Sequence, residues 1–317
     1  MRTPRRMVPD HLTRLWSRWR AGWGAEGRDP WRWLPVVGSV VAIGLMGALW
    51  LSAEDPKTGA EPRRPSLLEL LEEVTEQGRP EQAQPDQPPP KQPRAVAWSS
   101  PLAQQCSGID PKLRQRLLQE RRQLPDRRQR IAIDPTNFGD RYRRDPWGRN
   151  LNPSPRVVVL HETVYSLSSA LNTFRTPHPR DEDQVSYHTL IGLDGTVVDV
   201  VDPLKRAFGA GYSAFLGEWA ATNPNFQGSV NNFALHLSLE TPEDGQHNNP
   251  GHSGYTEAQY DALALVLHDW IRSFGIPPAA ITTHEHVDLG GERADPRSFD
   301  WSALQQRLAA LGDLCAG

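Results

Sequence analysis

The feature that most constrains this chain is a short run at residues 156–161 (RVVVLH), in which four apolar residues follow one another and three are β-branched. β-branched residues favour extended backbone. An apolar run without polar alternation is typical of a strand buried on both faces, as in sheets with helices on both sides. The run therefore predicts the central strand of an α/β domain.

Other segments supply the rest of such a domain. Residues 185–201 form two alternating runs around Asp194 and Gly195, which predicts a hairpin. Further strands are expected at residues 233–240 and just before His284. Helices are expected at residues 111–123, ending before Pro125, at residues 256–274, with Thr256 as N-cap and Gly275 as the stop, and after Trp301. The expected fold is a mixed central β-sheet flanked by helices on both faces.

The first third of the chain does not look like packed core. The chain has 317 residues, 29 of them Pro, and a mean hydropathy of −0.59. Residues 54–78 include a short amphipathic piece, and residues 79–105 are rich in Pro, Gln and Ala, which is typical of a semi-stiff spacer. We therefore expect a stalk and linker at residues 54–105 and a folded domain at residues 106–317.

The N-terminal residues predict a membrane anchor. Residues 34–52 carry no charge over a length of roughly 28 Å as a helix, close to the hydrocarbon thickness of about 30 Å. A transmembrane anchor at residues 34–53 is expected, after a basic tail at residues 1–33. The excess of Arg in this tail places it in the cytoplasm and the folded domain in the periplasm, outside a single-pass inner-membrane helix. A cleaved signal peptide is the alternative, disfavoured by the long preceding region and by Leu51.

Net charge and cysteine content bear on possible binding partners and on disulfide bonding. A net charge of −3 gives no bulk attraction to nucleic acid. Cys106 and Cys315 lie near the two ends of the expected domain, so a disulfide joining its termini is predicted for a domain outside the cytosol. Two unpaired thiols are the alternative. The domain is expected to be a monomer.

A metal site is predicted at the C-terminal end. Residues 281–301 hold His284 at the end of a short strand and Asp295 eleven positions later, after a Gly-Gly loop. His161 ends the central strand, where ligand positions of α/β sheets commonly lie. Catalytic Zn²⁺ uses three such N or O ligands plus water. Taken alone, each of these residues would have an ordinary structural explanation.

Six motifs in order resemble one family: VVVLHET, SYHTLIGLDGTV, LKRAFGAGYS, NNFALHLSLE, YTEAQYDALALVL and the stretch from His284 to Trp301. Over roughly residues 155–303 the chain resembles the zinc-dependent type 2 N-acetylmuramoyl-L-alanine amidases, which share their fold with the peptidoglycan recognition proteins. The resemblance implies that His161, His284 and Asp295 bind Zn²⁺. It also implies cleavage of the amide between N-acetylmuramic acid and L-alanine in peptidoglycan or muropeptides.

The resemblance also suggests catalytic residues. Tyr187 matches a catalytic tyrosine and is expected to stabilise the oxyanion. Arg293 stands where the family has a catalytic lysine; it keeps the charge but cannot donate its proton, so an electrostatic role is expected. His188 follows Tyr187 on a strand and should face the other way, which favours a structural role.

Three positions depart from the family. Ser238 replaces the catalytic Glu of the bacterial branch, and Gly209 stands where many bacterial members have His. Glu240 lies two residues beyond Ser238 on the same strand face, which makes it a fallback general base or a solvated residue. The chain is therefore expected to be a membrane-tethered zinc amidase. A tethered module that binds muropeptide without cutting it is the alternative, and the complete ligand set favours catalysis.

Overall fold

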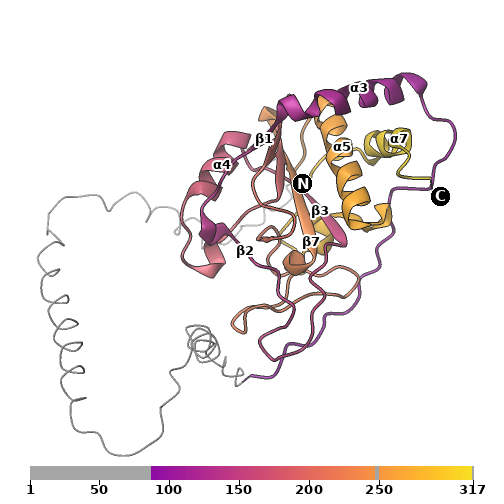
Figure 1. Cartoon of the computed structure of the whole chain (residues 1–317). Coiled ribbons are helices and arrows are strands. Elements are labelled where there is room, and N and C mark those ends of the chain that lie inside the picture. Colours follow the sequence, from indigo (N-terminus) through magenta and orange to yellow (C-terminus); the bar gives the residue numbers. More distant parts are fainter. Residues whose placement is uncertain (1–86, 247–249, 316–317) are drawn as a thin grey trace, which may run out of the picture. The chain divides into compact units, whose positions relative to one another are not determined.

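The computed structural model describes residues 87–246 and 250–315 (Figure 1). All of them belong to one compact unit, Glu76–Gly317; a second unit, Met1–Thr75, lies outside the described residues. The helices are α3 (Pro111–Arg127), α4 (Leu167–Arg175), α5 (Glu257–Phe274), α6 (His284–Val287) and α7 (Trp301–Leu311). The strands are β1 (Arg128–Arg130), β2 (Phe138–Gly139), β3 (Val157–Glu162), β4 (Thr189–Ile191), β5 (Val197–Asp199), β6 (Arg206–Ala207), β7 (Ala234–Leu239) and β8 (Ile281–Thr283).

A six-stranded mixed sheet forms the centre, in the order β1-β5-β4-β7-β3-β8. β3 is parallel to both of its neighbours, β7 and β8, and every residue of β3 and β7 is buried. The uninterrupted apolar run thus forms a fully buried strand, as predicted, but this strand lies next to the edge strand β8 and not at the centre of the sheet. β4 and β5 pair antiparallel around the turn at Gly195, whose φ of 80° is readily adopted by glycine, so the predicted hairpin is confirmed.

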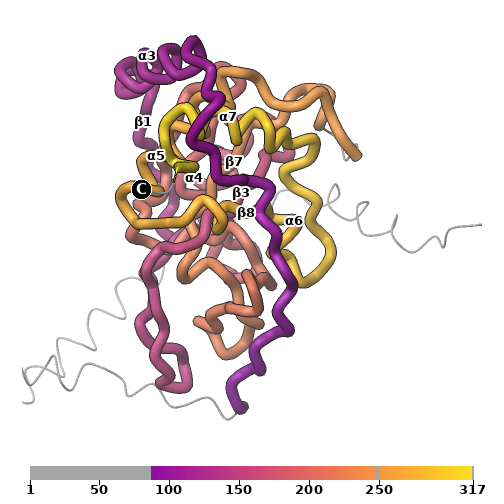
Figure 2. Tube along the Cα trace, turned by 90° about the vertical axis from the view of Figure 1, so that its right-hand side faces the viewer, coloured from indigo at the N-terminus to yellow at the C-terminus, as the bar shows by residue number. Residues whose placement is uncertain are grey.

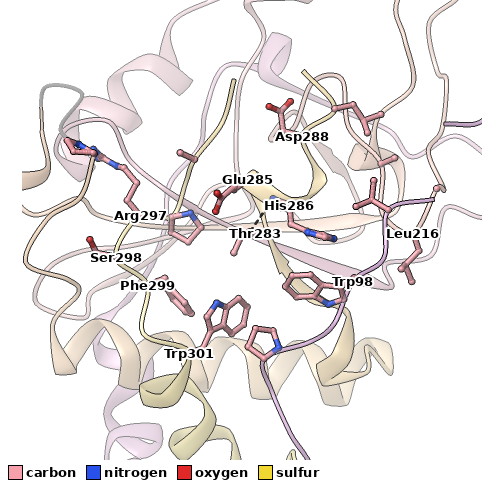
Figure 3. A pocket seen from close by; sticks show the side chains of 18 of the residues that line it. Trp98, Leu216, Thr283, Glu285, His286, Asp288, Arg297, Ser298, Phe299 and Trp301 are labelled. Carbon is pink, nitrogen blue, oxygen red and sulfur yellow. Dashed lines mark hydrogen bonds between the residues drawn. The ribbon is translucent and has the colours of Figure 1, made fainter. Parts of the chain in front are cut away.

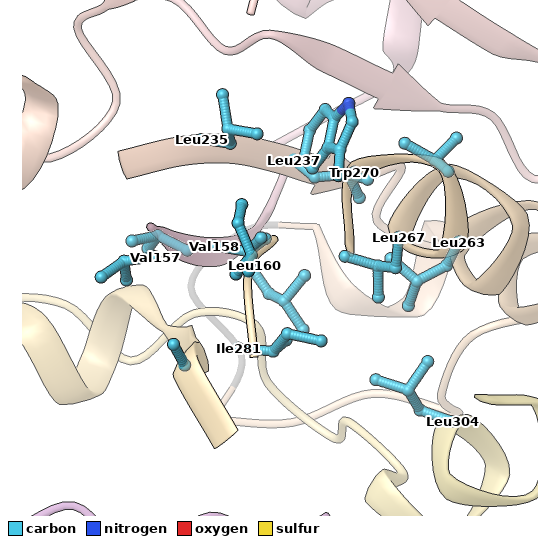
Figure 4. Packing of buried hydrophobic residues seen from close by; sticks show 14 of the residues in the cluster. Val157, Val158, Leu160, Leu235, Leu237, Leu263, Leu267, Trp270, Ile281 and Leu304 are labelled. Atoms are coloured by element: carbon cyan, nitrogen blue, oxygen red, sulfur yellow. The ribbon is translucent and has the colours of Figure 1, made fainter. Parts of the chain in front are cut away.

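Helices cover both faces of the sheet, as predicted. On one face, Leu263 and Leu267 of α5 pack with Leu304 of α7 against Leu160 and Leu237 of the sheet (Figure 4). On the other face, Leu171 and Phe174 of α4 pack in a smaller cluster with Leu190 and Val198. Figure 1 shows α4 on the opposite side of the strands from α5 and α7. The two apolar layers fix the sheet between them.

The ends of α5 follow the local signals in the sequence. The Thr256 hydroxyl accepts a hydrogen bond from the Gln259 N–H, and the Gln259 side chain returns one to the Thr256 N–H, which completes a capping box. Gly275 ends the helix in the left-handed conformation.

The end of α3 differs from the prediction, because α3 continues through Pro125 to Arg127. Pro125 lies in the last turn, and the carbonyl that it leaves without an intrahelical donor belongs to exposed Arg121, where water can satisfy it.

The Pro-rich segment at residues 87–105, here called the strap, lies against the folded domain instead of standing free. The indole N–H of Trp147 donates to Gln87 O, that of Trp98 donates to Ala279 O, and Ala103 exchanges hydrogen bonds with Gln305. Figure 2 shows the strap as an indigo tube running along the domain past α6. Because a Pro-rich backbone makes few internal hydrogen bonds, its polar groups remain available to the domain. The predicted linker is therefore part of the folded unit from residue 87 onward.

Two predictions about the ends of the chain have different outcomes. Cys106 and Cys315 form a disulfide across a sequence separation of 209, so the predicted pairing is confirmed. The predicted membrane anchor lies outside the described residues. In the part of the chain that the structure describes, no helix has the length and apolar character needed to cross a membrane.

Candidate metal centre

Sheet topology brings the two histidines together. His161 is the fifth residue of β3 and is fully buried. β8 pairs beside β3, with Thr283 opposite Leu160, so His284 at the start of α6 comes to the same end of the sheet. The imidazole centroids of His161 and His284 are 4.6 Å apart. His161 lies near the end of its strand, as predicted, whereas His284, expected at the end of a strand, is the first residue of a four-residue helix capped by the Thr283 hydroxyl.

Asp295 returns to the histidines from the loop after α6. Its backbone carbonyl accepts a hydrogen bond from the Glu285 N–H. Its carboxylate lies 3.2 Å from Nδ1 of His161 and 3.0 Å from Nδ1 of His284. The three residues predicted as ligands therefore converge.

The donor set fits a zinc ion. The three potential ligand atoms all lie within 4.8 Å of one another, and no other such group of His, Cys, Asp or Glu occurs within residues 87–246 and 250–315. Ligands of a tetrahedral Zn²⁺ at about 2.1 Å are roughly 3.4 Å apart, close to the two separations between Asp295 and the histidines, 3.2 and 3.0 Å. Two imidazoles and one carboxylate leave a fourth position open, as in catalytic zinc sites.

The surroundings of His161 and Asp295 favour the protonation states that bind a cation. Burial lowers the pKa of His161 to about 4, so its imidazole is neutral at pH 7. Burial by itself raises the pKa of Asp295, but the neighbouring imidazoles of His161 and His284 outweigh it and hold that pKa below its ordinary value. A neutral imidazole and an ionised carboxylate are the forms that bind metal.

A cleft of about 730 Å³ opens over the cluster, and Tyr187, Arg293, His284 and Asp295 line it. The Tyr187 ring stacks on His161 at 4.4 Å between centroids. Burial raises the pKa of Tyr187 above its ordinary value, so its hydroxyl remains protonated and able to donate. Arg293 is exposed at the rim, and its backbone N–H donates to Asp288. Both predicted residues therefore lie at the cluster.

Glu240 does not join the cluster, contrary to its expected role as a fallback base. One carboxylate oxygen accepts the Leu167 N–H at 2.7 Å and the other accepts the Leu193 N–H at 2.9 Å. These bonds hold the side chain between α4 and the β4–β5 turn. Glu240 is absent from the described residues that line the cleft.

Two other predicted residues lie where the strand alternation placed them. Ser238 stands opposite His161 in register, with a buried hydroxyl that has no partner among the described residues. His188 is not among the described residues that line the cleft, and its Nδ1 accepts the backbone N–H of His236 at 2.9 Å, which agrees with a structural role.

Glu162 is a residue of the site that the sequence reasoning missed. Its buried carboxylate accepts hydrogen bonds from Tyr255 at 2.7 Å and from Arg297, and its other partner is Nε2 of His252 at 2.9 Å. Because Arg297 follows Asp295 by two residues, this network ties the Asp295 loop to β3. The position of Glu162 directly after His161 was the available signal, but its partners lie at least 90 residues away.

A second cavity, of about 810 Å³, is also lined by residues of α6 (Figure 3). The strap supplies Trp98 to its wall, and α6 supplies Glu285 and His286. Figure 3 shows the Trp98 and Trp301 side chains on the same side of the pocket, with His286 above Trp98. The Trp98 and His286 rings are 4.3 Å apart. None of the three clustered residues lines this cavity, but Ala294 and Arg297 line both this cavity and the cleft over the cluster.

Comparisons with known proteins agree on one family. Residues 151–298 match the family model described as N-acetylmuramoyl-L-alanine amidase (Amidase_2). The chain is 33% identical over 124 residues to the 1,6-anhydro-N-acetylmuramyl-L-alanine amidase AmpD of Citrobacter freundii, covering 38% of this chain and 56% of that protein. It is 32% identical over 124 residues to AmpD of Escherichia coli K12, covering 38% of this chain and 57% of that protein. The chain thus spans less than two thirds of the length of these relatives.

Two solved structures are similar to part of this chain. A crystal structure of an AmpD derivative has a TM-score of 0.42 at 24% identity, covering 57% of this chain and 94% of that one. AmiD from E. coli, in complex with anhydro-N-acetylmuramic acid-L-Ala-D-γ-Glu-L-Lys, has a TM-score of 0.38 at 23% identity, covering 50% of this chain and 58% of that one.

Proposed function

Because residues 151–298 belong to the N-acetylmuramoyl-L-alanine amidase family, we propose that this protein hydrolyses the amide between N-acetylmuramic acid and L-alanine in peptidoglycan or its fragments, using zinc. Anhydromuramyl peptides are included among the proposed substrates because the relatives are named for them. The observation that carries the proposal is the convergence of His161, His284 and Asp295 at the cleft.

Each residue of the cleft has a proposed part in this reaction. His161, His284 and Asp295 would hold a zinc ion, which supplies Lewis-acid polarisation of a carbonyl and activation of water when bound. Tyr187 keeps its proton and donates a hydrogen bond to the oxygen on which negative charge develops. Arg293 adds positive charge at the rim of the cleft without moving a proton.

The decisive test replaces each proposed ligand by Ala in the full-length protein. Zinc content should fall sharply in all three variants, and release of stem peptide from purified sacculi and from anhydromuropeptides should cease, because three ligands leave no redundancy. Metal analysis and product masses provide the readouts. Tyr187→Phe is the matched variant: it should keep its zinc and lose on the order of 10²–10³ in rate. Wild-type zinc content and activity in the Asp295→Ala protein would refute the metal site.

The alternative, a module that binds muropeptide without cutting it, is favoured by one specific observation. A serine hydroxyl stands at position 238, and both carboxylate oxygens of Glu240 are already engaged by backbone N–H groups. If wild-type protein binds one zinc and muropeptide but releases no stem peptide, the binding module is the correct function. Ser238→Glu is then the substitution expected to introduce cleavage.

We further propose that the protein acts as a monomer at the outer face of the cytoplasmic membrane, anchored by residues 34–53. This proposal rests on the uncharged stretch and on the arginines before it. A reporter that is active only in the periplasm, fused after Gly317, should be active. Activity of a cytoplasmic reporter alone would overturn both the orientation and access to the wall.

A further inference from the structure

The imidazole of His161 is held at both nitrogens. Nδ1 lies 3.2 Å from the Asp295 carboxylate, and Nε2 lies 2.9 Å from Nδ1 of His236. Both histidines are fully buried. A metal-binding histidine usually donates its other N–H to an acceptor that fixes its orientation. Here that acceptor position is taken by a second histidine.

The neighbouring strand fixes His236 itself. β7 pairs parallel to β3 with His236 opposite Val159, so the His236 ring lies on the same side of the sheet as His161. The His236 N–H donates to Nδ1 of His188 at 2.9 Å, and the His236 carbonyl accepts the His188 N–H at 2.9 Å. The His188 and His236 rings are parallel within 8°. His236 is therefore a firm support for a ring that must keep its direction.

Gly209 leaves the space that His236 occupies. A Cβ atom at position 209 would lie 2.4 Å from both Cγ and Nδ1 of His236, the atom that contacts His161. Real Cβ atoms do not approach heavy atoms so closely, so any side chain at position 209 must displace the His236 ring. The missing side chain of Gly209 therefore gives the His236 ring its space.

The polar atoms of His236 are costly to bury. The His236 ring is fully buried, and only one of its two nitrogens, Nδ1, faces a polar group in the part of the chain that the structure describes, at 2.9 Å from Nε2 of His161. Its Nε2 is buried without a partner among the described residues. An unpaired buried polar atom destabilises a fold, so the stabilising polar contact of the His236 ring is the one made by its Nδ1.

We propose that His236 is a positioning residue for the metal centre: its Nδ1 accepts a hydrogen bond from Nε2–H of His161, which leaves the Nδ1 lone pair of His161 directed at the point shared with His284 and Asp295. Gly209 is the complement that gives His236 room. The inference rests on the zinc site of the proposed function. It adds two residues outside the ligand set that control the affinity of that site.

The test compares two substitutions of similar size in the full-length protein. Asn at position 236 carries its carbonyl oxygen near the position of Nδ1, whereas Leu has no acceptor. His236→Leu should weaken zinc binding by about 10–100-fold, the usual loss on removing such a support, and His236→Asn should restore most of it. Zinc dissociation constants come from competition with a chromogenic chelator. The visible spectrum of the Co²⁺-loaded protein reports the ligand geometry, and the melting temperature of the metal-free protein reports the fold.

Gly209→Ala tests whether His236 needs the space that Gly209 leaves. It should weaken zinc binding in wild-type protein but have no further effect in a His236→Ala background, where no ring meets the new methyl group. If His236→Leu does not fold, His236→Ala removes the same acceptor.

The outcomes separate the two proposals. Wild-type zinc affinity and an unchanged Co²⁺ spectrum in the Leu or Ala variant would overturn the role of His236 alone, as would losses in Leu and Asn variants that merely follow their melting temperatures. Wild-type protein that binds no zinc would overturn the proposed function and the positioning role together. Zinc binding without hydrolysis would refute catalysis, while the positioning role would still be decided by the affinities of these variants.

Discussion

The two halves of the candidate metal centre are held by different means. His161 lies on a strand that is paired on both sides and buried along its whole length. His284 and Asp295 lie on a four-residue helix and on the loop that follows it. The strand half depends on the global core, whereas the loop half depends on a small number of specific contacts.

Those contacts come from three directions. The Asp288 carboxylate accepts the backbone N–H groups of Gly290, Glu292 and Arg293 and so shapes the loop. The ion pair between Glu162 and Arg297 ties the loop to β3. On the far side of α6, Trp98 of the strap packs against His286. The difference predicts that core mutations destabilise the whole domain, while mutations of these contacts act mainly on metal binding.

The largest effect is expected in the strand half, from Leu237→Ala. Leu237 is fully buried beside Leu160 in register (Figure 4). Removing its side chain should lower the free energy of unfolding by about 2–5 kcal/mol, with little change in the zinc affinity of the protein that remains folded. Denaturant titration and chelator competition measure the two quantities. Leu204→Ala, at a side chain 68% exposed, should change stability by less than about 0.5 kcal/mol. A loss of zinc affinity without a loss of stability would contradict the assignment of His161 to the core.

The disulfide sharpens the comparison, because it pins the end of the strap to the C-terminus of the domain. Replacing Cys106 and Cys315 together by Ser should lower the free energy of unfolding by about 2–4 kcal/mol, since the bridge closes a loop across a separation of 209 residues. Reducing agent should destabilise the wild type similarly and leave the double variant unchanged. Equal stability of the wild type in oxidising and reducing buffer would contradict this prediction.

Trp98→Ala should act mainly on the loop half. The side chain is half-buried and contacts His286 and Trp301, so its loss should reduce the free energy of unfolding by about 1–3 kcal/mol, less than for a fully buried aromatic residue. Zinc affinity should also fall, because His286 lies two residues from the proposed ligand His284. Val96→Ala, at a strap residue 53% exposed, is the control. Identical zinc affinity in both variants would show that the strap does not support α6.

The smallest expected effect is a decrease in the free energy of unfolding at mildly acidic pH, caused by buried histidines in the strand half. Burial lowers the pKa of His161 to about 4 and that of His188 to about 3. Between these values and the unfolded pKa near 6.5, the unfolded chain binds more protons than the folded chain, so stability falls as the pH decreases. From pH 7 to pH 6 the metal-free protein should lose on the order of 1 kcal/mol. Denaturant titration in EDTA measures the change, and His188→Asn should make it smaller. Greater stability at pH 6 than at pH 7 would contradict the sign.

Much of the fold was predictable because its signals are local. The apolar run of β3, the Asp194-Gly195 turn and the Thr256 and Gly275 caps each act within one turn or one strand, where neighbouring residues determine the backbone. The clustering of His161, His284 and Asp295 was also predictable, because each stands at a recognisable place in an ordered set of motifs. The pairing of Cys106 with Cys315 followed from their places near the two ends of the domain.

The tertiary structure decided what joins distant residues. Sequence alternation placed Glu240 and Ser238 on one strand face. Only the packing of α4 and the β4–β5 turn supplies the two backbone N–H groups that bind the Glu240 carboxylate and hold it outside the cleft. The docking of the strap depends likewise on partners such as Ala279, which is 181 residues from Trp98. The contact between His161 and His236 spans 75 residues. Composition and periodicity describe a residue and its near neighbours, whereas these contacts arise from the pairing and packing of elements far apart in the chain.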